Sequence, residues 1–373
     1  MDRRRFLKLG GAVVAYSLFD WCGRSAAAHP GVAGAFQDLK AEAAPMLASV
    51  LQSPPFQKLW AELDDPAERG APASWSDDYL ASRFSVLTIN DAWGQSSRIG
   101  SLKSRNPKLA IMLYTLMTFP YAKGDSHTPP ADRLHNAAGR MVASDDAGNL
   151  RNLLDVWNPM ACQRAAQFSA SYARRKGFTG LYLDGRSTNR TIGDRTDTWR
   201  VWPDPGQISG WWQACLTNFY PAVRAAAQAN GLIVVTNTGD FQGGPTDDAV
   251  LPFVDGTYIE GWMNPDWGAA GNWEGSVKSV QRNVAARKIL GLNRGGGTKY
   301  AMAAIAAALC LGDGAYVWVS QGSWDRALVD ESARDVGMPL GAMQDHGDRV
   351  SREFSKVRVS VAKDLSKYSL DWK

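Results

Sequence analysis

The chain has 373 residues, of which 45% are hydrophobic and 21% are charged, so it can bury a substantial core as one large α/β barrel or two medium domains. The net charge is +4, and residues 1–28 alone carry +3, which leaves a nearly neutral body. Such a body lacks the basic surface that nucleic-acid binding requires, so we expect no nucleic-acid partner.

The first segment of the chain has the layout of an export signal. Arg3–Lys8 read R-R-R-F-L-K, a short apolar stretch follows, and Ala26-x-Ala28 supplies small residues for cleavage. This segment is similar to a twin-arginine signal and predicts export by the Tat machinery, with a periplasmic or secreted product that begins near His29. The apolar stretch is too short for an ordinary transmembrane helix, so we expect no stable membrane span after processing. An exposed basic tail before a short helix is the alternative.

The expected elements alternate along the rest of the chain. Residues 35–63 are expected to be helical, and a Pro/Gly/Asp-rich linker completes an N-terminal segment over 29–80. Apolar β-like runs then alternate with amphipathic helices. The expected strands are 84–90, 108–116, a weaker one before Asp155, 178–184, 232–238, 256–261, 288–292 and 315–320. The expected helices lie near 95–104, 160–176, 208–230, after 245, 274–286 and 299–311.

This alternation predicts a fold class. About eight strands over roughly 240 residues indicate a (β/α)₈ barrel, which we place at 81–325. A doubly wound open sheet is the alternative, but no Gly-rich phosphate turn follows the first expected strand. Residues 326–373 alternate polar and apolar side chains, which predicts a small C-terminal appendage of two or three antiparallel strands.

Several chemistries lack the residues they need. The histidines show no H-E-x-x-H or H-x-H spacing, and the three cysteines after residue 28 show no C-x-x-C, so we expect no metal and no cofactor. Cys162, Cys215 and Cys310 are interpreted as buried small hydrophobes. No G-x-S-x-G motif offers a serine nucleophile. The run Gly295–Lys299 lacks the full P-loop pattern and is better explained as an ordinary loop that leads into a helix.

Carboxylates stand where a barrel places its functional groups. Three of the better expected strands end on or beside an acidic residue, at Asp91, Asp184 and Glu260, and Asn237 ends another. Asp184 closes the fourth expected strand and Glu260 the sixth, so both side chains should converge over the same side of the rim. Glycoside hydrolysis uses such a pair, in which one carboxylic acid protonates the leaving oxygen and one carboxylate acts as nucleophile or base.

Each of these residues also has an ordinary explanation. Asp184 could simply accept hydrogen bonds from loop amides or cap the next turn. Glu260 is harder to explain in that way, because glutamate is depleted in strands and here lies inside Y-I-E-G-W, where an unpaired carboxylate would be costly. Asp91 could bind a substrate hydroxyl or serve only the loop.

Tryptophan is abundant, with 15 residues, and many of them fall in expected loops. Flat apolar rings with one donor stack well on sugar faces, although each ring taken alone is more often a packing residue. The tryptophans that follow expected strand ends favour a sugar-binding cleft. They are Trp93, Trp157, Trp262 and Trp324.

Around these residues the sequence resembles TIM-barrel glycoside hydrolases related to family 114, the endo-α-1,4-polygalactosaminidase group. The likeness runs over most of residues 80–372. The matching motifs are D-V-W-N-P at 155–159, G-F-T-G-L-Y-L-D-G at 177–185, V-T-N-T-G at 235–239 and V-D-G-T-Y-I-E-G-W at 254–262. The resemblance implies that Asp184 and Glu260 occupy the family's acidic positions and that Asn158 and Asn237 line the cleft. Arg186 departs from the pattern, because relatives often carry a further Asn or Asp there.

The sequence therefore predicts an exported (β/α)₈ glycoside hydrolase that acts on a polysaccharide or oligosaccharide. We expect Asp184 to be nucleophile or base and Glu260 to be general acid, because aromatic neighbours should desolvate Glu260. The expected substrate contacts are Asp91, Trp93, Tyr114, Asn158, Arg186, Asn237, Trp262 and Trp324. A non-catalytic glycan-binding barrel is the alternative, and a metal-dependent deacetylase would need a His/Asp cluster.

Overall fold

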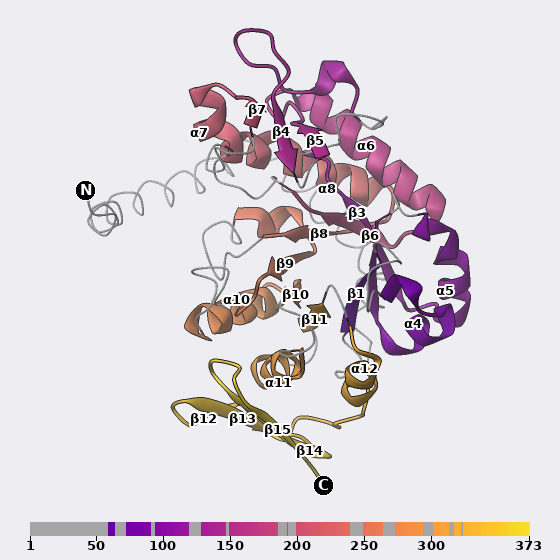
Figure 1. Cartoon of the computed structure of the whole chain (residues 1–373), viewed down its shortest axis with the longest axis vertical. Helices are drawn as coiled ribbons and strands as arrows, with labels where there is room; N and C mark the ends of the chain where they lie inside the picture. The colour runs from indigo at the N-terminus through magenta and orange to yellow at the C-terminus, as the bar shows by residue number, and fades with distance from the viewer. Residues whose placement is uncertain are drawn as a thin grey trace, which may run out of the picture. The chain divides into compact units, whose positions relative to one another are not determined.

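The computed structural model of the chain describes residues 59–63, 72–90, 94–118, 128–146, 149–185, 192, 199–238, 249–263, 273–293, 301–312, 317–321 and 324–373. Eight parallel strands close into a barrel, as the sequence predicts, and helices surround it (Figure 1). Around the barrel the strand order is β1-β11-β10-β9-β8-β6-β3-β2, and β2 pairs with β1 to complete the circle. The barrel strands are β1 (Leu59–Leu63), β2 (Val86–Ile89), β3 (Ala110–Thr115), β6 (Gly180–Leu183), β8 (Ile233–Asn237), β9 (Gly256–Glu260), β10 (Ile289–Asn293) and β11 (Val317–Gln321).

The first strand corrects the expected domain boundary. β1 lies inside the segment 35–63 that we expected to be helical, so the barrel begins before residue 81. The weaker strand before Asp155 exists as β5 (Asn149–Asn152), but it belongs to a separate three-stranded antiparallel sheet. The two errors cancel, and Asp184 therefore does follow the fourth barrel strand. Five residues are too short a run to reveal their period, and barrel closure decides their conformation.

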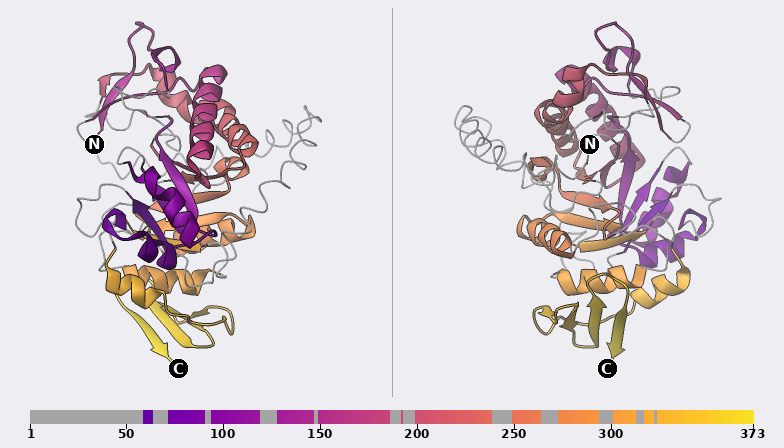
Figure 2. Two further views of the ribbon diagram at one scale, coloured as in Figure 1. Left: turned by 90° about the vertical axis from the view of Figure 1, so that its right-hand side faces the viewer. Right: turned by 60° about the vertical axis from the view of Figure 1, so that its left-hand side comes forward.

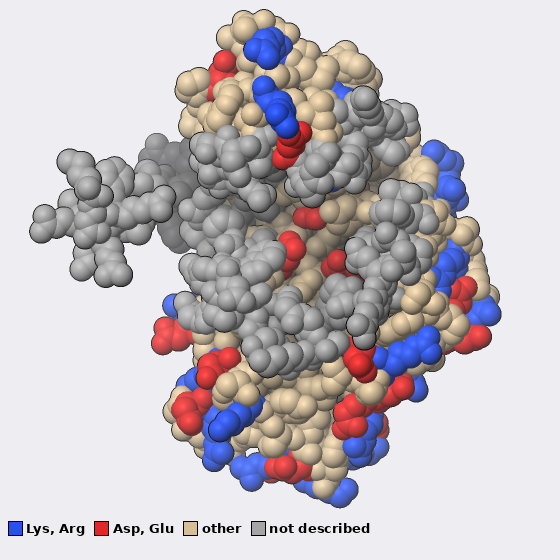
Figure 3. All heavy atoms as spheres, viewed as in Figure 1, with Lys and Arg blue, Asp and Glu red and all other residues tan. Residues whose placement is uncertain are grey.

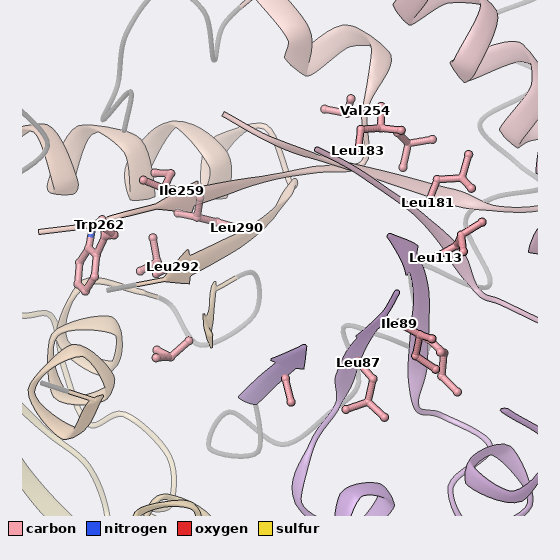
Figure 4. Packing of buried hydrophobic residues seen from close by; sticks show 14 of the residues in the cluster. Leu87, Ile89, Leu113, Leu181, Leu183, Val254, Ile259, Trp262, Leu290 and Leu292 are labelled. Atoms are coloured by element: carbon pink, nitrogen blue, oxygen red, sulfur yellow. The ribbon is translucent and has the colours of Figure 1, made fainter. Parts of the chain in front are cut away.

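Strict alternation of side chains divides the barrel core in two. One set of buried residues, which includes Trp60, Met112, Tyr182 and Tyr258, fills the barrel interior. The other set faces outward and packs against the helices, as the leucine and isoleucine side chains in Figure 4 show. Because parallel strands are covered on both faces, each reads as a continuous apolar run in the sequence.

Glycine makes room for large rings in the interior. A Cβ atom on Gly291 would lie 2.5 Å from Tyr258 Cδ2 and 3.0 Å from Trp60 Cζ3. The Trp60 and Tyr258 rings meet edge to face, with centroids 5.1 Å apart. Trp60 also donates its indole N–H to Thr88 Oγ1 at 2.7 Å, so its one polar atom is satisfied. These large side chains close the barrel below its mouth.

The helices follow the sequence pattern closely. Asn158 caps the start of the longest one, and Gly177, at φ 85°, ends it in the left-handed conformation that favours glycine. The α-helices are α4 (Asp77–Arg83), α5 (Ile99–Arg105), α6 (Pro159–Lys176), α7 (Pro205–Ala214), α8 (Tyr220–Ala229), α10 (Trp273–Ala285), α11 (Ala301–Leu311) and α12 (Arg326–Ser332). A π-helical turn, η8 (Cys215–Phe219), joins α7 to α8, and short 3₁₀ turns lie at η2 (Pro72–Ser74), η4 (Gln95–Arg98), η5 (Pro130–Asp132) and η9 (Leu251–Phe253). None of the described helices is both long and apolar enough to cross a membrane.

Two antiparallel sheets are added to the barrel. β4 (Ala143–Asp146), β5 and β7 (Trp199–Val201) form one of them, in the order β5-β4-β7. At the C-terminus a four-stranded sheet packs against α11, as both views in Figure 2 show, and confirms the expected appendage with more strands than anticipated. Its strands are β12 (Gln344–Asp345), β13 (Arg349–Glu353), β14 (Val357–Ala362) and β15 (Tyr368–Trp372).

Candidate active site

The carboxyl ends of the barrel strands form a polar rim. Each strand places a polar side chain at its last inward-facing position, because inward and outward residues alternate and the strands all run in one direction. Asn90 and Asp184 come one residue after the end of their strands. The full set is Glu62, Asn90, Tyr114, Asp184, Asn237, Glu260, Asn293 and Ser320. A cavity of about 210 Å³ opens at this end. It is lined by Glu62, Asn90, Tyr114, Tyr182, Asp184, Asn237, Tyr258 and Glu260. Figure 3 shows acidic side chains at the bottom of a central hollow.

Asn237 connects the two carboxylates that the sequence singled out. Its strand, β8, lies between β6, which Asp184 follows, and β9, which ends at Glu260. The Asn237 side-chain amide donates to Asp184 Oδ1 and to Glu260 Oε2, each at 2.9 Å. The two oxygens therefore lie no more than about 5.8 Å apart, twice that distance. With hydrogens about 120° apart on a planar amide, their separation is about 5 Å.

Asp184 is held by hydrogen bonds at both oxygens. Tyr114 Oη donates to Oδ2 at 2.5 Å while Asn237 donates to Oδ1. The Tyr114 ring is itself stacked on Tyr182, with centroids 5.8 Å apart and planes inclined by 24°. Donors at both oxygens fix the orientation of the Asp184 carboxyl group.

Glu260 lies in a different environment. Burial raises the pKa of its carboxyl group, the negative charge of Asp184 raises it further, and the hydrogen bond from Asn237 acts in the opposite direction. Glu260 therefore retains its proton to higher pH than an exposed glutamate. A carboxyl group that keeps its proton in this way can serve as a general acid.

Glu62 is a third carboxylate in the cavity, and it was not predicted from the sequence. It lies on β1, three strands from β6 in one direction around the barrel and three from β9 in the other. Tyr258 Oη donates to Glu62 Oε1 at 2.6 Å, and Asn293 Nδ2 donates to the same Tyr258 oxygen at 2.7 Å. Trp60 and Glu62 are two positions apart in L-W-A-E-L, the spacing of side chains on one face of a strand, and this spacing could have predicted the position of Glu62. The segment was instead expected to be helical.

The other expected site residues divide into three groups. Asp91, Trp93 and Arg186 lie outside the described residues. Tyr114 and Asn237 contact the carboxylate pair, as described above. Two aromatic residues and one amide are placed elsewhere.

Trp262 and Trp324 are buried, at 0% and 2% exposure, so in this structure neither ring is open to a sugar. Trp324 packs edge to face against Phe84 and donates its N–H to the Trp60 carbonyl at 3.3 Å. Asn158 caps α6, and its side-chain oxygen accepts from the backbone of that first turn. Tryptophan is common both in sugar-binding clefts and in the buried layer between a barrel and its helices, and the sequence alone does not distinguish these two locations.

No group of three or more metal-ligating side chains is present among the residues that the structure describes. Cys162, Cys215 and Cys310 are buried as free thiols. The described part of the cavity therefore offers carboxyl, amide and phenol groups for its chemistry.

The sequence matches no known family model and no curated protein. Solved structures do match. The ligand-free α-N-acetylgalactosaminidase NagBb from Bifidobacterium bifidum has a TM-score of 0.52 at 15% identity, over 88% of this chain and 60% of that enzyme. This chain thus corresponds to less than two thirds of NagBb. The glycoside hydrolase domain of PelA from Pseudomonas aeruginosa has a TM-score of 0.44 at 17% identity, over 70% of this chain and 93% of that domain. At 15% identity, the likeness to NagBb establishes a shared barrel fold.

Proposed function

We propose that this protein is a glycoside hydrolase that cleaves a polysaccharide or oligosaccharide by a retaining mechanism. The bridge from Asn237 to both carboxylates carries this proposal, because it holds their nearest oxygens within about 5.8 Å. Retaining enzymes have carboxyl groups about 5–5.5 Å apart, whereas inverting enzymes need about 6.5–9.5 Å to admit a water molecule.

The roles follow from the two environments. The Asp184 carboxylate, oriented by Tyr114 and Asn237, attacks the anomeric carbon and forms a covalent glycosyl ester. The bond from that carbon to the leaving oxygen breaks, and the proton on Glu260 passes to that oxygen. A water molecule then gives a proton back to Glu260 and attacks the same carbon, which releases Asp184 as a carboxylate.

The test is hydrolysis of a polysaccharide panel by the purified protein, with α-1,4-linked galactosamine oligosaccharides first, as the sequence resemblance suggests. Asp184→Asn and Glu260→Gln should each lower kcat by at least about 10³-fold while the melting temperature stays close to that of the wild type. Proton NMR of the first product should show the anomeric configuration of the substrate. An inverted product would refute the retaining mechanism, and full activity of either variant would refute the assigned pair.

We also propose that the segment before residue 29 exports the protein. The support is the R-R-R-F-L-K run and the Ala26-x-Ala28 site. A fusion of residues 1–35 to a reporter should reach the periplasm of a Tat-competent bacterium. Conversion of Arg3, Arg4 and Arg5 to lysine keeps the charge, so continued export of that variant would contradict a twin-arginine signal.

A further inference from the structure

Tyr182 lies directly beneath the carboxylate pair. It is an inward-facing residue of β6, two positions before Asp184, and it is 3% exposed. Its ring stacks on Tyr114 and meets Trp60 and Tyr258 edge to face, with centroids 5.8 and 5.1 Å away. Packed on three sides by aromatic rings, the Tyr182 side chain is fixed in position.

The three tyrosines of this cluster differ in their hydroxyl groups. Tyr114 donates to Asp184, and the Tyr258 hydroxyl contacts Glu62, Asn293 and Ser320. The Tyr182 hydroxyl, in contrast, has no hydrogen-bond partner in the described part of the chain, although the side chain lines the cavity. This hydroxyl is thus free to bond to a molecule in the cavity, whereas phenylalanine would fill the same space without offering a donor.

The ionisation state of Tyr182 suits a donor. Burial raises the pKa of this phenol well above its usual range, and the nearby charges of Asp184, Glu62 and Glu260 act in the same direction. The hydroxyl therefore keeps its proton at any pH at which a carboxylate pair would work. It offers one O–H to whatever enters the cavity.

We propose that Tyr182 is a substrate-contacting residue whose hydroxyl donates a hydrogen bond to a hydroxyl oxygen of the sugar held between Asp184 and Glu260. This rests on the proposed function, since it assigns a ligand contact within the same site. The partner is an acceptor oxygen of the bound sugar, and the contact orients the ring above the rigid aromatic floor. A site built around such a donor discriminates against sugars that lack the matching oxygen.

The test compares three tyrosine-to-phenylalanine variants. Tyr182→Phe should lower kcat/KM on α-1,4-linked galactosamine oligosaccharides, or on the polymer of the panel that the wild type cleaves, by at least about 10-fold. Its melting temperature should be unchanged or higher. Tyr258→Phe should lower the melting temperature by several degrees, because it removes the hydroxyl that contacts Glu62, Asn293 and Ser320. Tyr220→Phe, at a buried α8 residue that contacts Thr236, controls for loss of a phenol outside the barrel and should keep full kcat/KM.

A binding measurement without turnover distinguishes the role of Tyr182 from that of the carboxylate pair. In the Glu260→Gln background, where turnover is blocked, Tyr182→Phe should weaken calorimetric binding of the same oligosaccharide at least about 10-fold. Wild-type activity that persists in Tyr182→Phe, or a Tyr182→Phe protein destabilised as much as Tyr258→Phe, would overturn the role of Tyr182 and leave the carboxylate pair standing. A wild type that cleaves and binds none of the panel would overturn both.

Discussion

Replacement of Asn237 by alanine tests the central feature of the site. Asn237 is 6% exposed, and its amide makes one 2.9 Å hydrogen bond to each carboxyl group. A hydrogen bond to a charged group contributes about 1.5–3 kcal/mol. Loss of the bond that orients Asp184 should therefore lower kcat/KM by roughly 10- to 100-fold.

The same variant should shift the pH dependence in a defined direction. The hydrogen bond from Asn237 lowers the pKa of Glu260, so its removal should raise that pKa. Because Glu260 must be protonated to act as general acid, the alkaline limb of the kcat/KM profile should move to higher pH. The measurement is the pH profile of kcat/KM for wild type and variant on one substrate.

A second buried asparagine provides the control. Asn283 in α10 is 0% exposed and also makes two side-chain hydrogen bonds, from its amide to the Ser279 carbonyl and at its oxygen with Thr257 Oγ1. Asn283→Ala should lower stability without moving the alkaline limb. If the limb of Asn237→Ala stays in place or moves to lower pH, our account of how the bridge controls Glu260 is refuted.

Three further outcomes are expected. Gly291→Ala should destabilise the fold by about 1–3 kcal/mol in chemical denaturation, because the added methyl group overlaps the rings of the barrel interior. The control Gly100→Ala in α5 places its methyl group more than 4 Å from any atom outside the adjoining part of the helix and should be neutral or stabilising. Arg224→Ala should lower the free energy of unfolding by about 3–5 kcal/mol, because the buried Asp255 carboxylate loses the ion partner that contacts both of its oxygens at 2.8 Å. A variant as stable as the wild type would contradict this. Because the pKa of Glu260 is raised in the folded state, the wild type loses stability as pH rises from below 4.5 to neutral. Glu260→Gln does not titrate, so it should gain stability relative to the wild type over this range. A difference in melting temperature that does not change with pH would contradict the raised pKa.

The sequence determined most of the barrel and singled out two carboxylates that the structure places on either side of Asn237. Parallel strands covered on both faces appear as apolar runs, so seven of the eight barrel strands were recognisable, and the polar residues that follow them mark the mouth. Asp184 and Glu260 stood out because carboxylates are costly beside buried strands.

The tertiary structure decided what local pattern leaves open. Whether a tryptophan faces a cleft or the helices depends on its direction from the barrel, and Trp262 and Trp324 lie buried in the layer between the barrel and its helices. Glu62 joins the site only because β1 closes the barrel between β2 and β11, strands far apart along the chain. The separation of the two carboxyl groups, and the amide of Asn237 that sets it, depends on β8 lying between β6 and β9, a spatial relation that no run of neighbouring residues encodes.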